Sequence, residues 1–275
     1  MSAIAPTFRQ ERVRHVLGTR TLRVTAWRDL TPRMRRVTLA GPLEDLVSPG
    51  PGDHVKVFFP DPLTGVLNAP RVVDGQLVRP AGEVTARDYT PLLSDSGELE
   101  LDFVLHGDDG PASRWAARVQ HGEELVVAGP RGSLLPPQGP DWYVLAGDET
   151  ALPAISRWLR LLPADADVTV LAEVQDADDE AYLGGLAAGR AVTYLRRGDA
   201  APGTTTLLAQ AVQALPQRPG AGFWWLAGEA QSLVPARRYL RRELGLDPSA
   251  VDCSGYWRRG AADHDHHAPV DPGDR

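Results

Sequence analysis

The sequence predicts two domains of different fold class: an antiparallel β barrel, then an α/β domain with a parallel sheet. Between Thr21 and Ala128, apolar and polar side chains alternate with a period of two, interrupted by Gly and Pro. This alternation is typical of antiparallel strands with one buried face. After Asp141, continuous apolar runs alternate with segments of helical spacing, which indicates a parallel sheet covered on both sides. The length of 275 residues suffices for two cores.

The barrel domain is expected at residues 10–135. Its clearest strand is 98–105, whose apolar residues at alternate positions are predicted to face the core, while Glu98, Glu100 and Asp102 face water. Short strands separated by turn signals favour a small closed barrel of six strands. The other five strands are expected at 20–26, 34–39, 54–59, 87–92 and 124–128.

One predicted strand carries Arg87, Tyr89 and Thr90 near its end. Arg87 and Tyr89 share a face because successive side chains alternate, and Pro91 ends the pairing, which leaves Thr90 at a site rim. A guanidinium beside an aromatic ring suits a ligand that is anionic at one point and flat at another, such as a flavin dinucleotide; an ordinary strand is the alternative. Arg-x-Tyr-Thr resembles the flavin motif of the ferredoxin reductase superfamily. The resemblance implies that Arg87 contacts the pyrophosphate, Tyr89 stacks on the isoalloxazine and Thr90 faces its reactive edge.

A glycine-containing loop follows the strand 98–105 and leads into a short helix at Pro111. Pro suits the first helical turn, and the free N–H groups behind it form an anion site. Such a site contributes only ~0.3–1 kcal/mol when exposed, so it would position a pyrophosphate that Arg87 also contacts. The alternative is an ordinary loop before a helix. The cofactor contacts expected here are His106, Gly107, Gly110, Ala112, Ser113 and Trp115.

The α/β domain is expected at residues 141–260. Strands are predicted at 142–146, 168–172, 191–195 and 223–227, and helices at 152–162, 204–214 and 233–244, with Gly245 ending the last helix. Ligands of such sheets bind at the carboxyl ends of the strands. The candidate site therefore lies where these strands end.

Acidic residues dominate these strand ends. Asp148 and Glu149 follow the first strand, where they favour the helix dipole but repel a phosphate, so a dinucleotide is expected to bind with its pyrophosphate offset, or weakly. Glu173 can accept hydrogen bonds from a ribose. The acidic segment 176–180 would repel a 2′-phosphate, which favours NADH over NADPH unless it is only a solvated face. Asp148 and Glu229 are interpreted as structural acids at strand ends rather than a general acid/base pair.

Composition excludes several classes of function. The net charge of −7 argues against nucleic-acid binding. No apolar run reaches the ~20 residues of a membrane helix and the start lacks a signal-peptide pattern, so we expect a cytoplasmic protein without membrane insertion, and a monomer. Cys253 is the single cysteine, which excludes an internal disulfide, a four-cysteine zinc site and a cysteine-ligated iron–sulfur cluster. The histidines of 264–267 could bind metal loosely, but 261–275 is more typical of a disordered tail, so no metal site is predicted.

Three further blocks, at 147–155, 225–230 and 255–260, follow the two barrel motifs in order. Together they resemble the siderophore-interacting protein family, the flavin-dependent ferric-siderophore reductases of the ferredoxin reductase superfamily. The resemblance implies an FAD-binding barrel and a Rossmann-like NAD(P)H-binding domain, with a ferric chelate bound between them. The cofactor-binding residues expected in the second domain are Asp148, Thr150, Glu173, Glu229 and Trp257.

The resemblance also assigns a basic substrate pocket to Lys56, the single lysine of the chain, with Arg131, Arg258 and Arg259. Leu92 departs from the family, in which an arginine is frequent at that position. NAD(P)H or a ferredoxin would supply electrons to the flavin, which carries the chemistry, so no catalytic residue is predicted; reduction to Fe(II) releases the iron. The alternatives are a general flavin reductase, a ferredoxin-coupled electron-transfer flavoprotein, and a siderophore-binding carrier without turnover.

Overall fold

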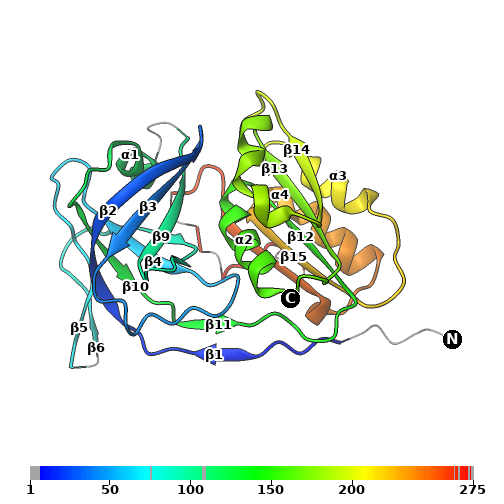
Figure 1. The fold of residues 1–275 in the computed structure, drawn as a ribbon, viewed down its shortest axis with the longest axis horizontal. Helices are drawn as coiled ribbons and strands as arrows, with labels where there is room; N and C mark the ends of the chain where they lie inside the picture. Colours follow the sequence, from blue (N-terminus) through cyan, green and yellow to red (C-terminus); the bar gives the residue numbers. More distant parts are fainter. Residues whose placement is uncertain are drawn as a thin grey trace. The chain divides into compact units, whose positions relative to one another are not determined.

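The computed structural model describes residues 7–74, 76–106, 110–262, 264–265, 267–271 and 273. It divides the chain into two compact units, Arg12–Leu135 and Met1–Glu11 with Pro136–Arg275. Figure 1 shows that strands dominate the first unit and that helices flank a sheet in the second. The start of the chain belongs to the second unit, which the sequence does not predict. There the Phe8 ring packs edge-on against Phe223 at 6.3 Å between centroids, and the backbone N–H of Phe8 donates to Ser249 Oγ.

The first unit is built on a seven-stranded antiparallel sheet. In spatial order its strands are β7 (Thr85–Tyr89), β4 (Val55–Phe59), β10 (Glu124–Ala128), β2 (Thr19–Thr31), β3 (Met34–Ala40), β9 (Leu99–Val104) and β8 (Leu92–Leu93). The two edge strands, β7 and β8, are separated in the chain only by Thr90 and Pro91, so the sheet must curl back on itself. The predicted antiparallel barrel is confirmed. The strand expected at 87–92 is split because Pro91 has no N–H to donate.

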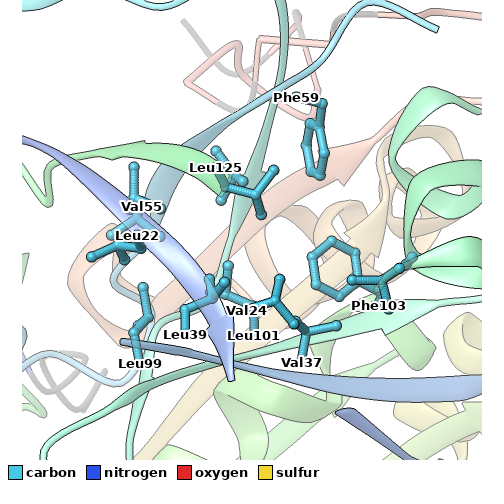
Figure 2. Packing of buried hydrophobic residues seen from close by; sticks show 14 of the residues in the cluster. Leu22, Val24, Val37, Leu39, Val55, Phe59, Leu99, Leu101, Phe103 and Leu125 are labelled. Atoms are coloured by element: carbon cyan, nitrogen blue, oxygen red, sulfur yellow. The ribbon is translucent and has the colours of Figure 1, made fainter. Parts of the chain in front are cut away.

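The barrel core consists of the inward-facing side chains of these strands (Figure 2). Leu99, Leu101 and Phe103 of β9 are fully buried, as the alternation predicts, and they meet Leu22 and Val24 of β2. Truncating one such buried leucine to Ala costs about 2–5 kcal/mol of folding free energy. The core therefore fixes the face on which each neighbouring side chain lies.

Asp102 does not face water, and that prediction was wrong. Its side chain is fully buried because Arg36, directly opposite on β3, donates to both of its oxygens at 2.7 Å. Arg36 also donates to Glu100 at 3.0 Å. A two-point guanidinium–carboxylate pair supplies the hydrogen bonds that a buried carboxylate needs, so the acid can be buried at a position whose pattern indicates exposure.

Four short strands of this unit form two small sheets that were not predicted. Strand β1 (Arg12–Arg14) pairs with β11 (Gly132–Leu134), and β5 (Arg71–Val73) pairs with β6 (Gln76–Val78) in a separate hairpin. Strands of three residues are too short to show a period of two. Helix α1 (Pro111–Arg118) begins at Pro111, as predicted.

The second unit contains a parallel sheet, as predicted, but with five strands where four were expected. In spatial order its strands are β14 (Ala191–Arg196), β13 (Val168–Val174), β12 (Trp142–Gly147), β15 (Gly222–Glu229) and β16 (Val251–Trp257). The edge strand β16 was not predicted because Asp252, Ser254 and Gly255 interrupt its apolar residues. The helices are α2 (Leu152–Leu161), α3 (Leu207–Ala214) and α4 (Ala230–Arg238), which continues into a π-helical turn, Tyr239–Glu243; four short 3₁₀ segments are Glu149–Ala151, Ala177–Tyr182, Gly184–Ala187 and Pro248–Ala250.

The tail packs against α4 at Val270 and Asp271. Val270 is buried in the core cluster that includes Leu233 and Leu240. Asp271 is 1% exposed and accepts hydrogen bonds from Arg238 at 2.7 Å and Arg242 at 2.8 Å, contacts that lower its pKa to about 2. The prediction of a disordered tail therefore fails at these two residues. Among the described residues, no helix is long and apolar enough to span a bilayer.

Candidate functional site

Tyr89 stands at the end of β7 in a group of four aromatic rings. The register pairs Tyr89 with Val55, which is fully buried, so Tyr89 lies on the inner face of the sheet. Its ring packs on Phe103 at 4.5 Å between centroids, and Phe59 and Trp115 complete the group. Tyr89 itself is only partly buried. The ring is supported from the core side and retains exposed surface.

Burial raises the pKa of the Tyr89 hydroxyl well above its ordinary value, and the nearby charge of Arg87 opposes this shift only in part. The phenol therefore stays protonated at physiological pH. A neutral, supported aromatic face is what stacking against a flat ring requires.

Arg87 shares the inner face with Tyr89, as the alternation predicts, because it pairs with the buried Val57. Its guanidinium donates to the carbonyl of Ala86 at 2.6 Å, and no carboxylate among the described residues pairs with it. It is therefore a partly buried cation without a counter-charge. Thr90 follows directly but is only 8% exposed, more enclosed than the predicted rim position.

Helix α1 begins after Gly110, which lies in an extended conformation and, as a glycine, has no side chain to cap the first turn. Ser113 is 4% exposed, and its hydroxyl accepts the N–H of His106 at 3.2 Å, which ties the loop to the helix. A side chain at position 110 would meet the His106 ring at 3.3 Å. Ala112 is also buried, and Gly107 lies outside the described residues.

Trp115 supplies a test of whether a flavin fits. Its indole N–H is buried and has no hydrogen-bond partner among the described residues, although buried donors are nearly always paired. Arg87, which donates to the carbonyl of Ala86, has no carboxylate partner among the described residues. These groups, with the exposed face of Tyr89, match a ligand with a flat ring and an anionic pyrophosphate, so the residues present fit FAD.

Lys56 lies on the other face of the same strand pair. It is opposite Asp88, and its ammonium is 3.0 Å from the Asp88 carboxylate. Asp88 partly neutralises the charge of Lys56. The Lys56 side chain is 44% exposed, so its ammonium also remains in contact with water. The exposed Arg131 follows Ala128, the residue that pairs with Lys56 on β10. The sequence does not reveal the pairing with Asp88.

In the second unit, Asp148 connects three strand ends. Its oxygens accept hydrogen bonds from the Thr150 N–H and hydroxyl after β12, the Glu229 N–H of β15 and the Trp257 indole of β16. Burial raises its pKa, and these four donors oppose the shift. The structure thus brings Asp148, Thr150, Glu229 and Trp257 together as predicted, but it satisfies the carboxylate internally.

The other predicted carboxylates are also occupied. Glu229 caps α4 by accepting the Ser232 N–H at 2.6 Å, and its second oxygen accepts the Arg259 N–H at 3.1 Å. Glu173 accepts the Thr205 hydroxyl at 2.8 Å, and burial raises its pKa. The interpretation of Asp148 and Glu229 as structural acids agrees with these contacts. Arg258 and Arg259 follow β16 with exposed side chains.

Glu149 and Arg197 form a buried ion pair that the sequence analysis missed. The Glu149 side chain is 8% exposed and that of Arg197 is 4% exposed. Burial and the neighbouring Asp148 charge raise the pKa of Glu149 to about 7, although Arg197 opposes them. Arg197 directly follows β14. A search of the strand ends for arginines as well as for acids would therefore have identified it as a candidate site residue. The first helical turn after β12 is already capped by Asp148, which agrees with the expected offset of a dinucleotide pyrophosphate.

Family models match both units. Residues 23–134 match the siderophore-interacting FAD-binding domain, and residues 140–260 match the siderophore-interacting protein model. The chain belongs to the siderophore-interacting protein family. The barrel is therefore its FAD-binding domain, in agreement with the fit at Arg87, Tyr89 and Trp115.

Named relatives and solved structures of this family cover nearly the whole chain. A ferric vibriobactin reductase of Vibrio cholerae is 33% identical over 86% of this chain and 89% of its own length. An NADPH-dependent ferric-chelate reductase of Escherichia coli is 34% identical over 90% of this chain and 96% of its own. The crystal structure of a siderophore utilization protein from T. fusca is 43% identical, covers 94% of this chain and 100% of that chain, and has a TM-score of 0.88.

Proposed function

We propose that this protein is a flavin-dependent ferric-siderophore reductase that releases iron as Fe(II). Support comes from family membership over both units and from the names of its reductase relatives. The observation that carries the proposal is that Arg87, beside the partly buried ring of Tyr89, has no carboxylate partner among the described residues. FAD, when bound, supplies the redox chemistry that moves electrons from a nicotinamide nucleotide to Fe(III).

The barrel residues would bind and orient FAD. Arg87 is proposed to hold the pyrophosphate together with the N–H groups at the start of α1, because a guanidinium and the N-terminus of a helix both attract an anion. Tyr89 provides a neutral face for the isoalloxazine, and Thr90 bounds the site at the strand end. Trp115 supports the Tyr89 side from within, and His106, Gly107, Gly110, Ala112 and Ser113 shape the loop around the phosphates.

Basic side chains would attract the anionic ferric chelate. Lys56 and Arg131 come from the barrel, and Arg258 and Arg259 from the segment after β16. Because Lys56 already pairs with Asp88, it acts by exchanging part of that contact for a chelate oxygen. Fe(II) carries less charge than Fe(III) and is held less tightly by hard oxygen ligands, so reduction becomes release. No protein nucleophile or general base is required.

The electron donor is proposed to be NADH or NADPH bound at the carboxyl end of the parallel sheet. Asp148, Thr150, Glu229 and Trp257 would shape this edge through the hydrogen bonds that Asp148 accepts from the other three, and Glu173 through its bond with Thr205. The acidic segment 176–180 favours NADH, whereas the Escherichia coli relative is named NADPH-dependent. A ferredoxin is the alternative donor. We further propose a monomeric, cytoplasmic protein, which sedimentation velocity and cell fractionation would test.

The decisive experiment is anaerobic incubation of the FAD-loaded protein with NADH or NADPH and several ferric siderophores. A coloured ferrous chelator records the product. We expect ferrous iron to appear with at least one siderophore, and Tyr89→Ala to lower flavin content and the rate together. A general flavin reductase would instead reduce free FMN at comparable rates. A colourless protein that cannot be reconstituted with FAD would be a siderophore carrier.

A further inference from the structure

The segment between β4 and β7 exposes an unusual amount of apolar surface. Leu63 is 92% exposed, and Val73 and Val78 are half exposed. Six of the eleven large apolar side chains that are exposed in the described chain lie in residues 63–84, namely Leu63, Val66, Val72, Val73, Val78 and Val84. Such a concentration indicates a binding surface, because scattered single residues are the normal case.

The centre of this segment is the β5–β6 hairpin, which Figure 1 shows as an arm outside the barrel sheet. The register pairs Arg71 with Val78 and Val73 with Gln76. Because alternate residues share a face, Arg71, Val73 and Val78 lie on the same side. None of the described hairpin residues is buried. A two-stranded hairpin is only marginally stable alone. Its exposed valines bury little surface within the protein and therefore add little to its stability.

The Arg71 face borders an open cavity of about 280 Å³. The lining combines two guanidinium groups and one amide with apolar walls, and it contains no acid: Leu67, Asn68, Ala69, Arg71, Val73, Val78, Arg79 and Pro80. Within the described residues, neither Arg71 nor Arg79 has an ion-pair or hydrogen-bond partner. Two unpaired cations at one cavity repel each other, and an anion between them relieves that repulsion.

Two other exposed arginines of this acidic chain have carboxylate partners. Arg23 pairs with Glu124 at 2.6 Å and Arg196 with Glu180 at 2.6 Å. The acids of the hairpin segment do not take this role at the cavity. Asp61 accepts the N–H groups of Leu63 and Thr64 in its own turn, and neither Asp74 nor Glu83 lines the cavity. The cavity is therefore locally cationic and apolar on a protein of net charge −7.

We propose that the β5–β6 hairpin attaches the protein to a membrane surface that contains anionic phospholipid. A lipid phosphate occupies the cavity between Arg71 and Arg79, and Val73 and Val78 enter the interfacial layer. Positive charge combined with apolar side chains is the chemistry of interfacial attachment. A small ligand in the cavity leaves Leu63, Val66 and Val72 unexplained, whereas an extended surface accounts for them. The proposal does not depend on the reductase activity.

Vesicle co-sedimentation tests this attachment with the full-length, FAD-loaded protein. Vesicles of phosphatidylcholine with phosphatidylglycerol are compared with phosphatidylcholine alone, at low and high salt. We expect binding only to the anionic vesicles, and weaker binding at high salt because exposed charges are screened. Arg71→Ala combined with Arg79→Ala should lower partitioning about 30-fold, since each arginine near an anionic surface contributes about 1 kcal/mol.

Matched controls separate local chemistry from net charge. Arg12→Ala with Arg14→Ala removes two exposed arginines from β1 and should leave partitioning unchanged. Val73→Ser with Val78→Ser should weaken binding at both salt concentrations, whereas Val16→Ser, at a side chain that is 93% exposed, should not. All seven side chains substituted in the test and control variants are exposed, and circular dichroism verifies that the variants fold.

Three results would overturn the proposal. The first is equal binding of the wild type to both vesicle types, which needs no variant. The second is an equal loss in the β1 control. The third is a pair of results: glycerol 3-phosphate displaces the protein from the vesicles, and the Val73→Ser/Val78→Ser variant binds the vesicles as well as the wild type does. Together these would identify a site for a soluble anion.

Discussion

The two ligand-facing regions of this protein treat their polar groups in opposite ways. Around β7 and α1, Arg87 has no carboxylate partner and the indole N–H of Trp115 has no acceptor among the described residues. At the carboxyl end of the parallel sheet, Asp148, Glu229 and Glu173 all accept hydrogen bonds from their own unit. The first region is prepared to receive a ligand, and the second uses its charged groups to hold strand ends together.

This difference predicts which substitutions damage the fold and which damage binding. Residues with internal partners should mainly affect the stability of their unit. Residues without such partners should mainly affect the ligand. The following experiments test this division, beginning with the largest effect.

Asp148→Ala should be the most damaging change. It leaves the buried N–H groups of Glu229 and Trp257 without an acceptor, and an unpaired buried donor costs about 1–3 kcal/mol. We expect the free energy of unfolding of the parallel-sheet unit to fall by roughly 3 kcal/mol, measured by urea denaturation with tryptophan fluorescence. The FAD content of the barrel should stay near the wild-type value. Loss of FAD without a change in unfolding would contradict the division.

Arg87→Ala should show the reverse behaviour. Among the described residues, the one hydrogen bond of the guanidinium is to the carbonyl of Ala86, so its removal should change the free energy of unfolding by less than about 0.5 kcal/mol. A charge-assisted contact to a phosphate contributes about 1.5–3 kcal/mol, which corresponds to a 10- to 150-fold weaker affinity for FAD. Titration of the apoprotein by flavin fluorescence measures this, with Arg12→Ala as the control. An unchanged affinity for FAD would show that Arg87 does not contribute to FAD binding.

Glu149 makes stability depend on pH. Its pKa rises from an ordinary 4.5 to about 7 on folding, so the native state binds its proton more tightly than the unfolded state does. This contribution is present at low pH and is lost as pH rises from about 4.5 through 7. We expect the unfolding free energy of the sheet unit to fall by on the order of 2 kcal/mol between pH 5 and pH 8.

Glu149→Gln supplies the control for that pH dependence. The amide does not titrate, so the slope between pH 5 and pH 8 should flatten. Unfolding followed at several pH values compares the two proteins. An identical slope in the variant would assign the effect to Asp148 or Glu173, whose pKa values burial also raises.

The sequence predicts local features of both regions well, and long-range pairings poorly. The alternation of side chains places Arg87 and Tyr89 on one face, and the strand register agrees. By contrast, Arg197 is 48 residues from Glu149 in the chain. No local period reports such a contact, just as none reports the burial of Asp102 beneath Arg36. Partners therefore decide whether a charged residue is available to a ligand, and they come from the tertiary structure.

Lys56 tests the division at its boundary, with the smallest expected effect. Its side chain is 44% exposed and that of its partner Asp88 is 22% exposed, and surface pairs contribute about 0–1 kcal/mol. Lys56→Ala should therefore hardly change unfolding, but it should raise KM for an anionic ferric chelate several-fold at low salt, with kcat and FAD content preserved. Arg23→Ala is the matched control, because Arg23 also pairs with an acid on the barrel surface. If both variants raise KM equally, general surface charge attracts the chelate. If neither variant raises KM, the pairing with Asp88 keeps Lys56 from binding the substrate.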